Sequence, residues 1–214
     1  MYNNRVVIHA VCGLALLLPG MAVAAIAYDE AVNGDFAAAD LETSGISPGT
    51  FVEGMTAGVN TITGSFGYSD AIGRDTDVFS FEVPAGHQLT AINLTYATVS
   101  GDAVGGAYFG IQNGLAIGTG YATVDANLSN ALIMESGDIL STFAAGPAFG
   151  GTGLTAPLGA GNYTMFLSET AAVIDYGMDF NVSAVPEPET YAMLLAGLGL
   201  VGVMARRRKT SIGK

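Results

Sequence analysis

Short runs in which apolar and polar residues alternate recur through the middle of the chain, residues 28–185. In Asp77–Val83 (DVFSFEV) two phenylalanines and a valine fall on one side of an extended chain, and Tyr176–Val182 repeats the pattern. A period of two is typical of strands with one buried face. The same region contains 24 glycines, which disfavour helices and supply turns. The sequence therefore predicts an all-β fold, a Gly-rich, jelly-roll-like β-sandwich of about eight strands.

Further segments complete the predicted sandwich. Clear alternation is present in Leu89–Tyr96 and Tyr163–Leu167, and four other strands are expected at Asn60–Phe66, Ala107–Gln112, Ala116–Thr123 and Ile139–Phe143. Pro84-Ala85-Gly86 predicts a tight turn between two of the strands. Leu128–Glu135 is the one segment expected to form a helical turn.

The first 27 residues have the three regions of an export signal. Arg5 gives a positive start, Val6–Leu18 is an apolar run of 13 residues, and small residues follow. Because about 20 residues are needed to span a bilayer, the pattern favours a removable Sec-type signal helix over an anchor. We expect the Sec translocon and signal peptidase as partners, with cleavage after Ala24 or Ala27. The lone cysteine, Cys12, would leave with the signal, so the mature protein would have no disulfide.

The C-terminal segment, residues 186–209, has three parts in a fixed order. Pro186-Glu187-Pro188 comes first, and 15 uncharged residues follow at Tyr191–Ala205. As a helix this run would be about 22 Å long, which predicts a short transmembrane helix. A basic stop comes next and consists of Arg206, Arg207, Arg208 and Lys209. The positive-inside rule places this stop and the tail 210–214 in the cytoplasm and the middle region outside.

This arrangement resembles the PEP-CTERM protein-sorting signal of Gram-negative bacteria, through Pro186-Glu187-Pro188, the Gly- and Leu-rich helix Ala192–Met204 and the cluster Arg206–Arg208. The resemblance implies that exosortase, a membrane-embedded Cys-dependent transpeptidase, is a partner and cuts near the Pro-Glu-Pro motif. It also implies that the exterior domain passes through an inner-membrane intermediate to the cell surface or the exopolysaccharide matrix. An ordinary C-terminal anchor is the alternative, but it accounts for the helix alone.

Two strings in the middle region resemble pieces of the pre-peptidase C-terminal type of β-sandwich of secreted bacterial proteins. One is Asp77–Gly86, with its paired-aromatic strand and Pro-x-Gly turn, and the other is the Gly-x-Tyr strand Gly161–Leu167. This resemblance implies a non-catalytic domain for adhesion or carbohydrate binding, sometimes with calcium.

Charge is divided unevenly along the chain. The whole chain has a formal net charge of −12, but residues 28–185 hold 17 acidic residues against Arg74 alone, which gives −16. Such a region has no basic patch for nucleic acid or anionic lipid. Cations, neutral glycans and other matrix proteins remain as partners of the exterior region.

Few residues between 28 and 185 suit catalysis. His87 is the only histidine there, the region has no cysteine, and no Gly-x-Ser-x-Gly motif occurs. A zinc site with two or more His or Cys ligands is excluded by count, and a nucleophile–base pair would depend on His87. We therefore expect that the protein is not an enzyme. The alternative is a secreted polysaccharide hydrolase that uses two carboxylates.

Calcium is the candidate cofactor. Asp70, Asp75 and Asp77 lie within eight residues, in a Gly-containing stretch that leads into a predicted strand. Hard carboxylate oxygens suit Ca²⁺, so these three are the candidate metal ligands. The stretch is no EF-hand, because Phe79 and Ser80 stand where a ligand and a glycine are needed. A solvated acidic loop is the alternative. Two further acidic groups are Asn33 with Asp35, and Asp175 with Asp179.

Together these patterns predict an exported, non-enzymatic surface or extracellular-matrix protein. Exosortase would sort and cleave it, and the β-sandwich would serve structure, adhesion or glycan binding in an exopolysaccharide setting such as a biofilm.

Overall fold

The computed structural model describes residues 25–36, 46, 48–71, 73–119, 126–186 and 192–202. The strands are β1 (Ala25–Asp29), β2 (Thr50–Val52), β3 (Gly58–Ser69), β4 (Gly73–Val83), β5 (His87–Gly101), β6 (Ala107–Asn113), β7 (Ser129–Ile133), β8 (Gly137–Asp138), β9 (Gly161–Ser168) and β10 (Ala172–Ala184). The helices are α1 (Glu30–Asn33) and α2 (Ile139–Ala145). A further helical stretch occupies residues 192–202. The predicted all-β fold is confirmed.

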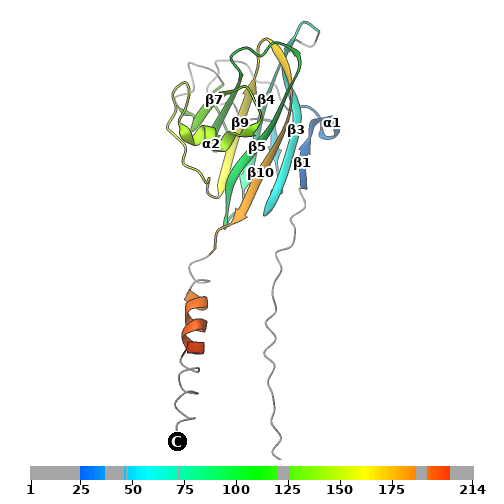
Figure 1. Cartoon of the computed structure of the whole chain (residues 1–214). Coiled ribbons are helices and arrows are strands. Elements are labelled where there is room, and N and C mark those ends of the chain that lie inside the picture. Colours follow the sequence, from blue (N-terminus) through cyan, green and yellow to red (C-terminus); the bar gives the residue numbers. More distant parts are fainter. Residues whose placement is uncertain are drawn as a thin grey trace, which may run out of the picture.

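Strands β3 to β10 form one continuous hydrogen-bonded sheet, which curls into two facing halves (Figure 1). One half has the order β3-β10-β5-β8 and the other has the order β4-β9-β6-β7. Successive strands from β3 to β10 mostly pass from one half to the other. β3 and β4 pair with each other only beside their hairpin, through Gly67–Ser69 and Gly73–Asp75. The two short strands β1 and β2 add to β3 and β4 in parallel.

The core lies between the two halves and is rich in aromatic rings. Phe81 of β4 packs edge-on against Phe180 of β10 at a centroid distance of 4.9 Å, and Phe66 of β3 meets Phe109 of β6 at 5.6 Å. All four side chains are fully buried. Because each ring buries a large apolar area, these cross-half pairs hold the curled sheet closed.

The turn between β4 and β5 has the predicted form. The His87 N–H donates to the Pro84 carbonyl at 3.0 Å, and Gly86 has φ +74°. A positive φ at the third position of the turn explains the glycine there.

Two predicted elements are exchanged in the structure. Ile139–Phe143, expected as a strand, belongs to helix α2, because Asp138 caps it by accepting a hydrogen bond from Leu140 N–H and its apolar residues share one helical face. Leu128–Glu135, expected as a helical turn, contains strand β7, which pairs with β6. Of the predicted strand Ala116–Thr123, Ile117 forms an isolated bridge with Ile46, and residues 120–123 lie outside the described residues.

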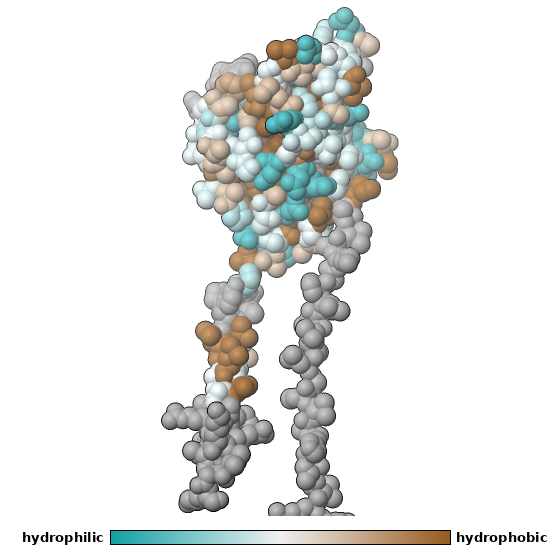
Figure 2. All heavy atoms as spheres, viewed as in Figure 1, coloured by the Kyte–Doolittle hydropathy of each residue, from teal (hydrophilic) through white to brown (hydrophobic). Residues whose placement is uncertain are grey.

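The predicted membrane segments are only partly covered. Residues 1–24 of the predicted signal lie outside the described residues, whereas Ala25–Asp29 form β1. Residues 192–202 of the predicted transmembrane helix are helical and expose apolar side chains (Figure 2), including Met193 and Leu195. Tyr191 and residues 203–205 of that helix are not described, nor is the basic stop 206–209. Within the described ranges, no helix combines the length and apolarity needed to cross a membrane.

Candidate functional site

An interruption in the pairing along one edge of β3 creates the candidate site. β1 pairs with β3 as far as Thr63, and β4 pairs with β3 only from Gly67 onward. Between these points no strand of the described residues pairs with this edge of β3. β4 itself turns away after Asp75 and pairs with β9 from Thr76. The gap between β1 and β4 is filled by the chain that follows β1, which is α1 and the residues up to Phe36.

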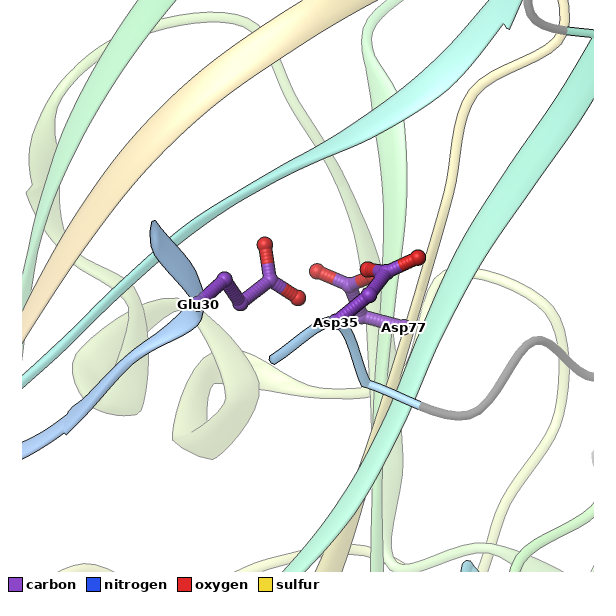
Figure 3. Close-up of side chains that lie close together, drawn as sticks. All are labelled: Glu30, Asp35 and Asp77. Carbon is purple, nitrogen blue, oxygen red and sulfur yellow. The ribbon is translucent and has the colours of Figure 1, made fainter. Parts of the chain in front are cut away.

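Three carboxylates meet at this gap, two from the segment that follows β1 and one from β4 (Figure 3). Glu30 comes from α1, Asp35 from the loop after it, and Asp77 from β4. One oxygen of each lies within 4.8 Å of one oxygen of each of the others. Asp35 is exposed, Glu30 is half-buried and Asp77 is fully buried.

Glu30 is held by backbone donors on both of its oxygens. Oε1 accepts from the Phe36 N–H at 3.0 Å, and Oε2 accepts from the Ser65 N–H at 2.8 Å. The second bond satisfies a donor of β3 at the gap, where no neighbouring strand can do so. Gly64 allows this approach, because a Cβ there would collide with the Glu30 carboxylate and would lie 2.7 Å from the Tyr176 hydroxyl.

Asp77 has one satisfied oxygen and one that is not. Oδ2 accepts from the Tyr176 hydroxyl at 2.7 Å, whereas Oδ1 is buried and has no hydrogen-bond partner. An unpaired buried carboxylate oxygen is costly, by about 1–3 kcal/mol or more for a charged group. Among the described residues of the site, Asp77 Oδ1 is the buried acceptor without a hydrogen bond.

An aromatic stack fixes the segment that carries Asp35. The ring of Phe36 lies between those of Tyr28 and Phe79, at centroid distances of 4.3 and 4.6 Å. The Tyr28 hydroxyl donates to the Gly34 carbonyl at 2.8 Å. These contacts join the end of β1 to the core and hold the loop at the mouth of the gap.

The pKa values of the carboxyl groups in this cluster are raised. Burial raises the pKa of Glu30 to about 7, against the lowering effect of its two backbone donors, and the nearby charge of Asp35 adds to the rise. Burial and then the charge of Glu30 raise the pKa of Asp77 well above its ordinary range. Burial and then Asp35 raise the pKa of Asp75 to about 6. With no cation bound, the cluster therefore retains protons near neutral pH.

Glu30 and Asp35 border a hollow of about 820 Å³ that is open to solvent, whereas the buried Asp77 does not line it. It is lined by Asp29, Glu30, Ala31, Asp35, Thr63, Gly64, Ser65, Arg74, Asp75, Asp175 and Tyr176. The donor set is made of carboxylate, hydroxyl and backbone oxygens, which suits a hard divalent cation. Of the ion types considered from the sequence, Ca²⁺ fits this set best.

The three predicted metal ligands are separated by the structure. Asp77 belongs to the three-carboxylate group and Asp75 lines the hollow. Asp70 lies instead at the tip of the β3–β4 hairpin, where it accepts from the Tyr68 hydroxyl at 3.2 Å. Glu30 and Asp35 were not among the predicted ligands. Asp35 belongs to the further acidic group with Asn33 that the sequence indicates, and for Glu30 the available cue was the acidic pair Asp29-Glu30.

Other residues singled out from the sequence lie apart from the carboxylate group. His87 begins β5, with its Nδ1 3.0 Å from the Ala85 carbonyl oxygen, and does not line the hollow. Asp179 accepts from the Thr61 hydroxyl at 2.6 Å. Asp175 lines the hollow but does not belong to the three-carboxylate group.

Comparison with known proteins identifies the C-terminal segment. The family model of the PEP-CTERM protein-sorting motif matches residues 184–209. This confirms the resemblance that rests on Pro186-Glu187-Pro188, the helix after it and the basic cluster. The chain is therefore an exported protein of the class that exosortase sorts. No curated protein matches the chain. The likeness to the pre-peptidase sandwich stays a prediction.

Proposed function

We propose that the mature protein is a non-enzymatic component of the cell surface or extracellular matrix, in which the sandwich serves structure, adhesion or glycan binding. Sec exports the chain, and the helix 191–205 holds it in the inner membrane with the basic stop in the cytoplasm. Exosortase then cuts near Pro186-Glu187-Pro188 and releases the domain to the surface or an exopolysaccharide matrix. The observation that carries this proposal is the sorting motif at residues 184–209.

The end of the fold supports processing at this place. β10 ends at Ala184, and the Val185 N–H makes a hydrogen bond to the Gly86 carbonyl at 2.8 Å. Pro186 is exposed directly after it. Cleavage at or after the motif would therefore leave every strand of the sandwich in place.

The start of the fold favours one of the two signal-cleavage sites. Cleavage after Ala27 would remove three of the five residues of β1, including the pairs Ala25–Asn60 and Ile26–Thr61. Cleavage after Ala24 would keep the whole strand. We therefore expect the mature protein to begin at Ala25, which N-terminal sequencing or intact mass measurement of the secreted form would test.

The secreted hydrolase is the second candidate, and one observation favours it. Carboxyl groups with pKa values of about 7 at Glu30 and about 6 at Asp75 border an open hollow, and a general acid needs such a value. Against it stands the spacing. The oxygens of Glu30, Asp35 and Asp77 lie within 4.8 Å of one another, which is closer than the about 5–9.5 Å by which paired glycosidase carboxyls flank a sugar bond.

Replacement of Pro186-Glu187-Pro188 by three alanines in the host tests the sorting step. We expect the uncut chain to accumulate in the membrane fraction, because exosortase would lose its recognition motif. Alanine replacement of Thr210-Ser211-Ile212, beyond the matched segment, is the matched control and is expected to leave processing intact. Unchanged surface delivery of the Pro-Glu-Pro variant would refute the sorting proposal.

Binding and hydrolysis can be separated with the processed protein and the host's own exopolysaccharide. Co-sedimentation with the polymer and no release of reducing sugar is the expected result. Release of reducing sugar that is lost in Glu30→Gln would support the hydrolase instead.

A further inference from the structure

We propose that Glu30, Asp35 and Asp77 bind one Ca²⁺ ion, and that this ion fastens the segment after β1 to the corner where β3 and β4 part. The inference goes beyond the surface role proposed above and does not depend on it. It also differs from the set Asp70, Asp75 and Asp77 that the sequence predicts, since two of its three ligands precede the first long strand.

The spacing of the three oxygens suits one calcium ion. Ligands on opposite sides of Ca²⁺ are about 4.6–5.2 Å apart, because each Ca–O distance is about 2.3–2.6 Å. The three carboxylates each have an oxygen within 4.8 Å of the other two. A single ion between them can thus reach all three with small side-chain adjustments, and Figure 3 shows the three groups converging from different segments.

The buried oxygen of Asp77 is the independent sign of a missing ligand. Asp77 has an exposed fraction of 0%, and its Oδ1 has no hydrogen-bond partner. The other oxygen is oriented by the Tyr176 hydroxyl, so the carboxylate is fixed and not free to turn toward solvent. Buried carboxylates are normally paired or bound to a metal. One oxygen of this carboxylate lies in the cluster, so a cation there would neutralise the buried group.

Charge balance points the same way. Glu30, Asp35, Asp75 and Asp77 all lie in or beside the cluster, and Arg74 is the only cationic side chain between residues 28 and 185. One arginine does not offset these four carboxylates when they are ionised, as they must be to bind a metal. Bound Ca²⁺ would neutralise two charges, and it takes carboxylate oxygens and water in a flexible shell of 6–8 ligands. Water in the open hollow would complete the shell on the side of Asp35.

The ligands come from both sides of the gap, which gives the ion a structural role. Glu30 and Asp35 belong to the segment that follows β1, whereas Asp77 belongs to β4. Without the ion, this segment is held by the two backbone bonds to Glu30 and by the stack on Phe36. With it, the mature N-terminus would be tied to a core strand. Ca²⁺ should therefore protect this end of the domain most strongly.

The test measures Ca²⁺ binding and melting on the full chain, purified in detergent and stripped with a chelator. Titration calorimetry should give one site per chain, with a dissociation constant in the range of about 10⁻⁴–10⁻³ M usual for extracellular modules. At 5 mM Ca²⁺ the melting temperature should rise by roughly 5 °C, because a ligand that binds only the folded state stabilises it. Equal concentrations of Mg²⁺ control for ionic strength, and an equal response to Mg²⁺ would contradict the assignment to Ca²⁺.

Paired variants locate the site. Asp35→Asn changes an exposed residue and should fold normally, yet weaken Ca²⁺ binding at least tenfold, and Asp77→Asn should do the same. Asp70→Asn and Asp179→Asn are matched controls outside the group and should leave binding unchanged. Loss of binding in Asp70→Asn, with retention in Asp35→Asn, would move the site to the hairpin and overturn the proposal. Absence of any Ca²⁺-specific heat or melting shift would overturn it as well.

Discussion

The two ends of β4 place the same alternating row of side chains in different surroundings. From Phe79 to Val83, every second residue enters the aromatic core, where Phe79, Phe81 and Val83 are fully buried. At the other end the same row continues with Asp75 and Asp77, and Asp77 is just as buried. A carboxylate in a core-facing row is costly unless something neutralises it. The aromatic end of β4 packs into the core, whereas the acidic end carries the buried carboxylate on which the proposed Ca²⁺ site depends.

The aromatic end should give the largest effect on stability. Phe81→Ala removes a ring that packs on Phe180 at 4.9 Å and on Tyr163 at 5.7 Å. We expect the free energy of unfolding to fall by about 3–5 kcal/mol, because the cavity cannot be refilled from the facing sheet. Urea denaturation in the presence of Ca²⁺ measures this loss.

The matched control for that variant is Phe51→Ala on the edge strand β2, where the side chain is 36% exposed. Its loss should be distinctly smaller. Equal losses at both positions would show that the aromatic end of β4 is no tighter than the edge.

The acidic end should respond to substitution in the opposite direction when no Ca²⁺ is present. Asp77→Asn keeps the shape and can still accept from Tyr176, but it removes a buried charge. In chelator at pH 8 we expect the variant to be more stable than the wild type by about 1–3 kcal/mol. In 5 mM Ca²⁺ the order should reverse or the gap should close. Thermal unfolding of the variant and the wild type, in chelator and in Ca²⁺, measures this change of order. A variant that is less stable than the wild type in chelator would contradict the proposal that Asp77 is a metal ligand.

The metal-free chain should lose stability as the pH rises toward neutrality. The pKa of Glu30 is raised from an ordinary value of 4.5 to about 7, so the folded state binds more protons than the unfolded state in that window. Stability is then fully present below pH 4.5 and falls as the pH approaches 7. Since Glu30 is half exposed, solvent screening reduces the effect to about 1–2 kcal/mol. The charged side chains near Glu30 are Asp35 and Asp77 in the cluster and Arg74, Asp75 and Asp175 around the hollow.

Denaturation of the chelated chain at pH 4.5, 6 and 7.5 measures this slope. Glu30→Gln, which cannot titrate, is the matched variant and should show a flatter profile. A wild-type chain whose stability rises between pH 4.5 and 7 would refute the raised pKa.

Strands with strict alternation were predictable because one buried face imposes a period of two. The same alternation also indicates that Asp77 is buried, because it precedes Phe79 and Phe81 at the same spacing of two residues. The strand prediction for Ile139–Phe143 is wrong because a short apolar run fits a strand or a helix equally. The N-cap residue that favours the helix, Asp138, lies just outside this run.

The rest of the site follows from pairing between distant segments. Glu30 reaches Ser65 only because β1 pairs in parallel with β3, which brings together residues 35 positions apart. No local pattern encodes that pairing. Asp70, by contrast, was grouped with Asp75 and Asp77 by closeness in the sequence, and the hairpin carries it away to the tip.

The smallest expected effect concerns Gly64, which sets the position of the Glu30 carboxylate. Gly64→Ala would place a Cβ against that carboxylate and 2.7 Å from the Tyr176 hydroxyl. Both neighbours are ends of side chains and can shift, so stability should change little. The Glu30 oxygens, however, would be displaced from the point at which they meet Asp35 and Asp77. We expect Ca²⁺ affinity to fall roughly threefold to tenfold, equivalent to about 0.7–1.4 kcal/mol.

Gly177→Ala is the matched control for this variant, because it lies beside Tyr176 in β10 and its Cβ would meet only Thr63 and Thr95 at ordinary contact distances of 3.8 and 3.9 Å. Its Ca²⁺ affinity, measured by calorimetry, should match that of the wild type. If both alanines weaken binding equally, the loss comes from general stiffening of the sheet. If only Gly64→Ala weakens binding, the space beside Gly64 is what positions the Glu30 carboxylate near Asp77. The acidic end of β4 then differs from its aromatic end because this glycine leaves room for a carboxylate.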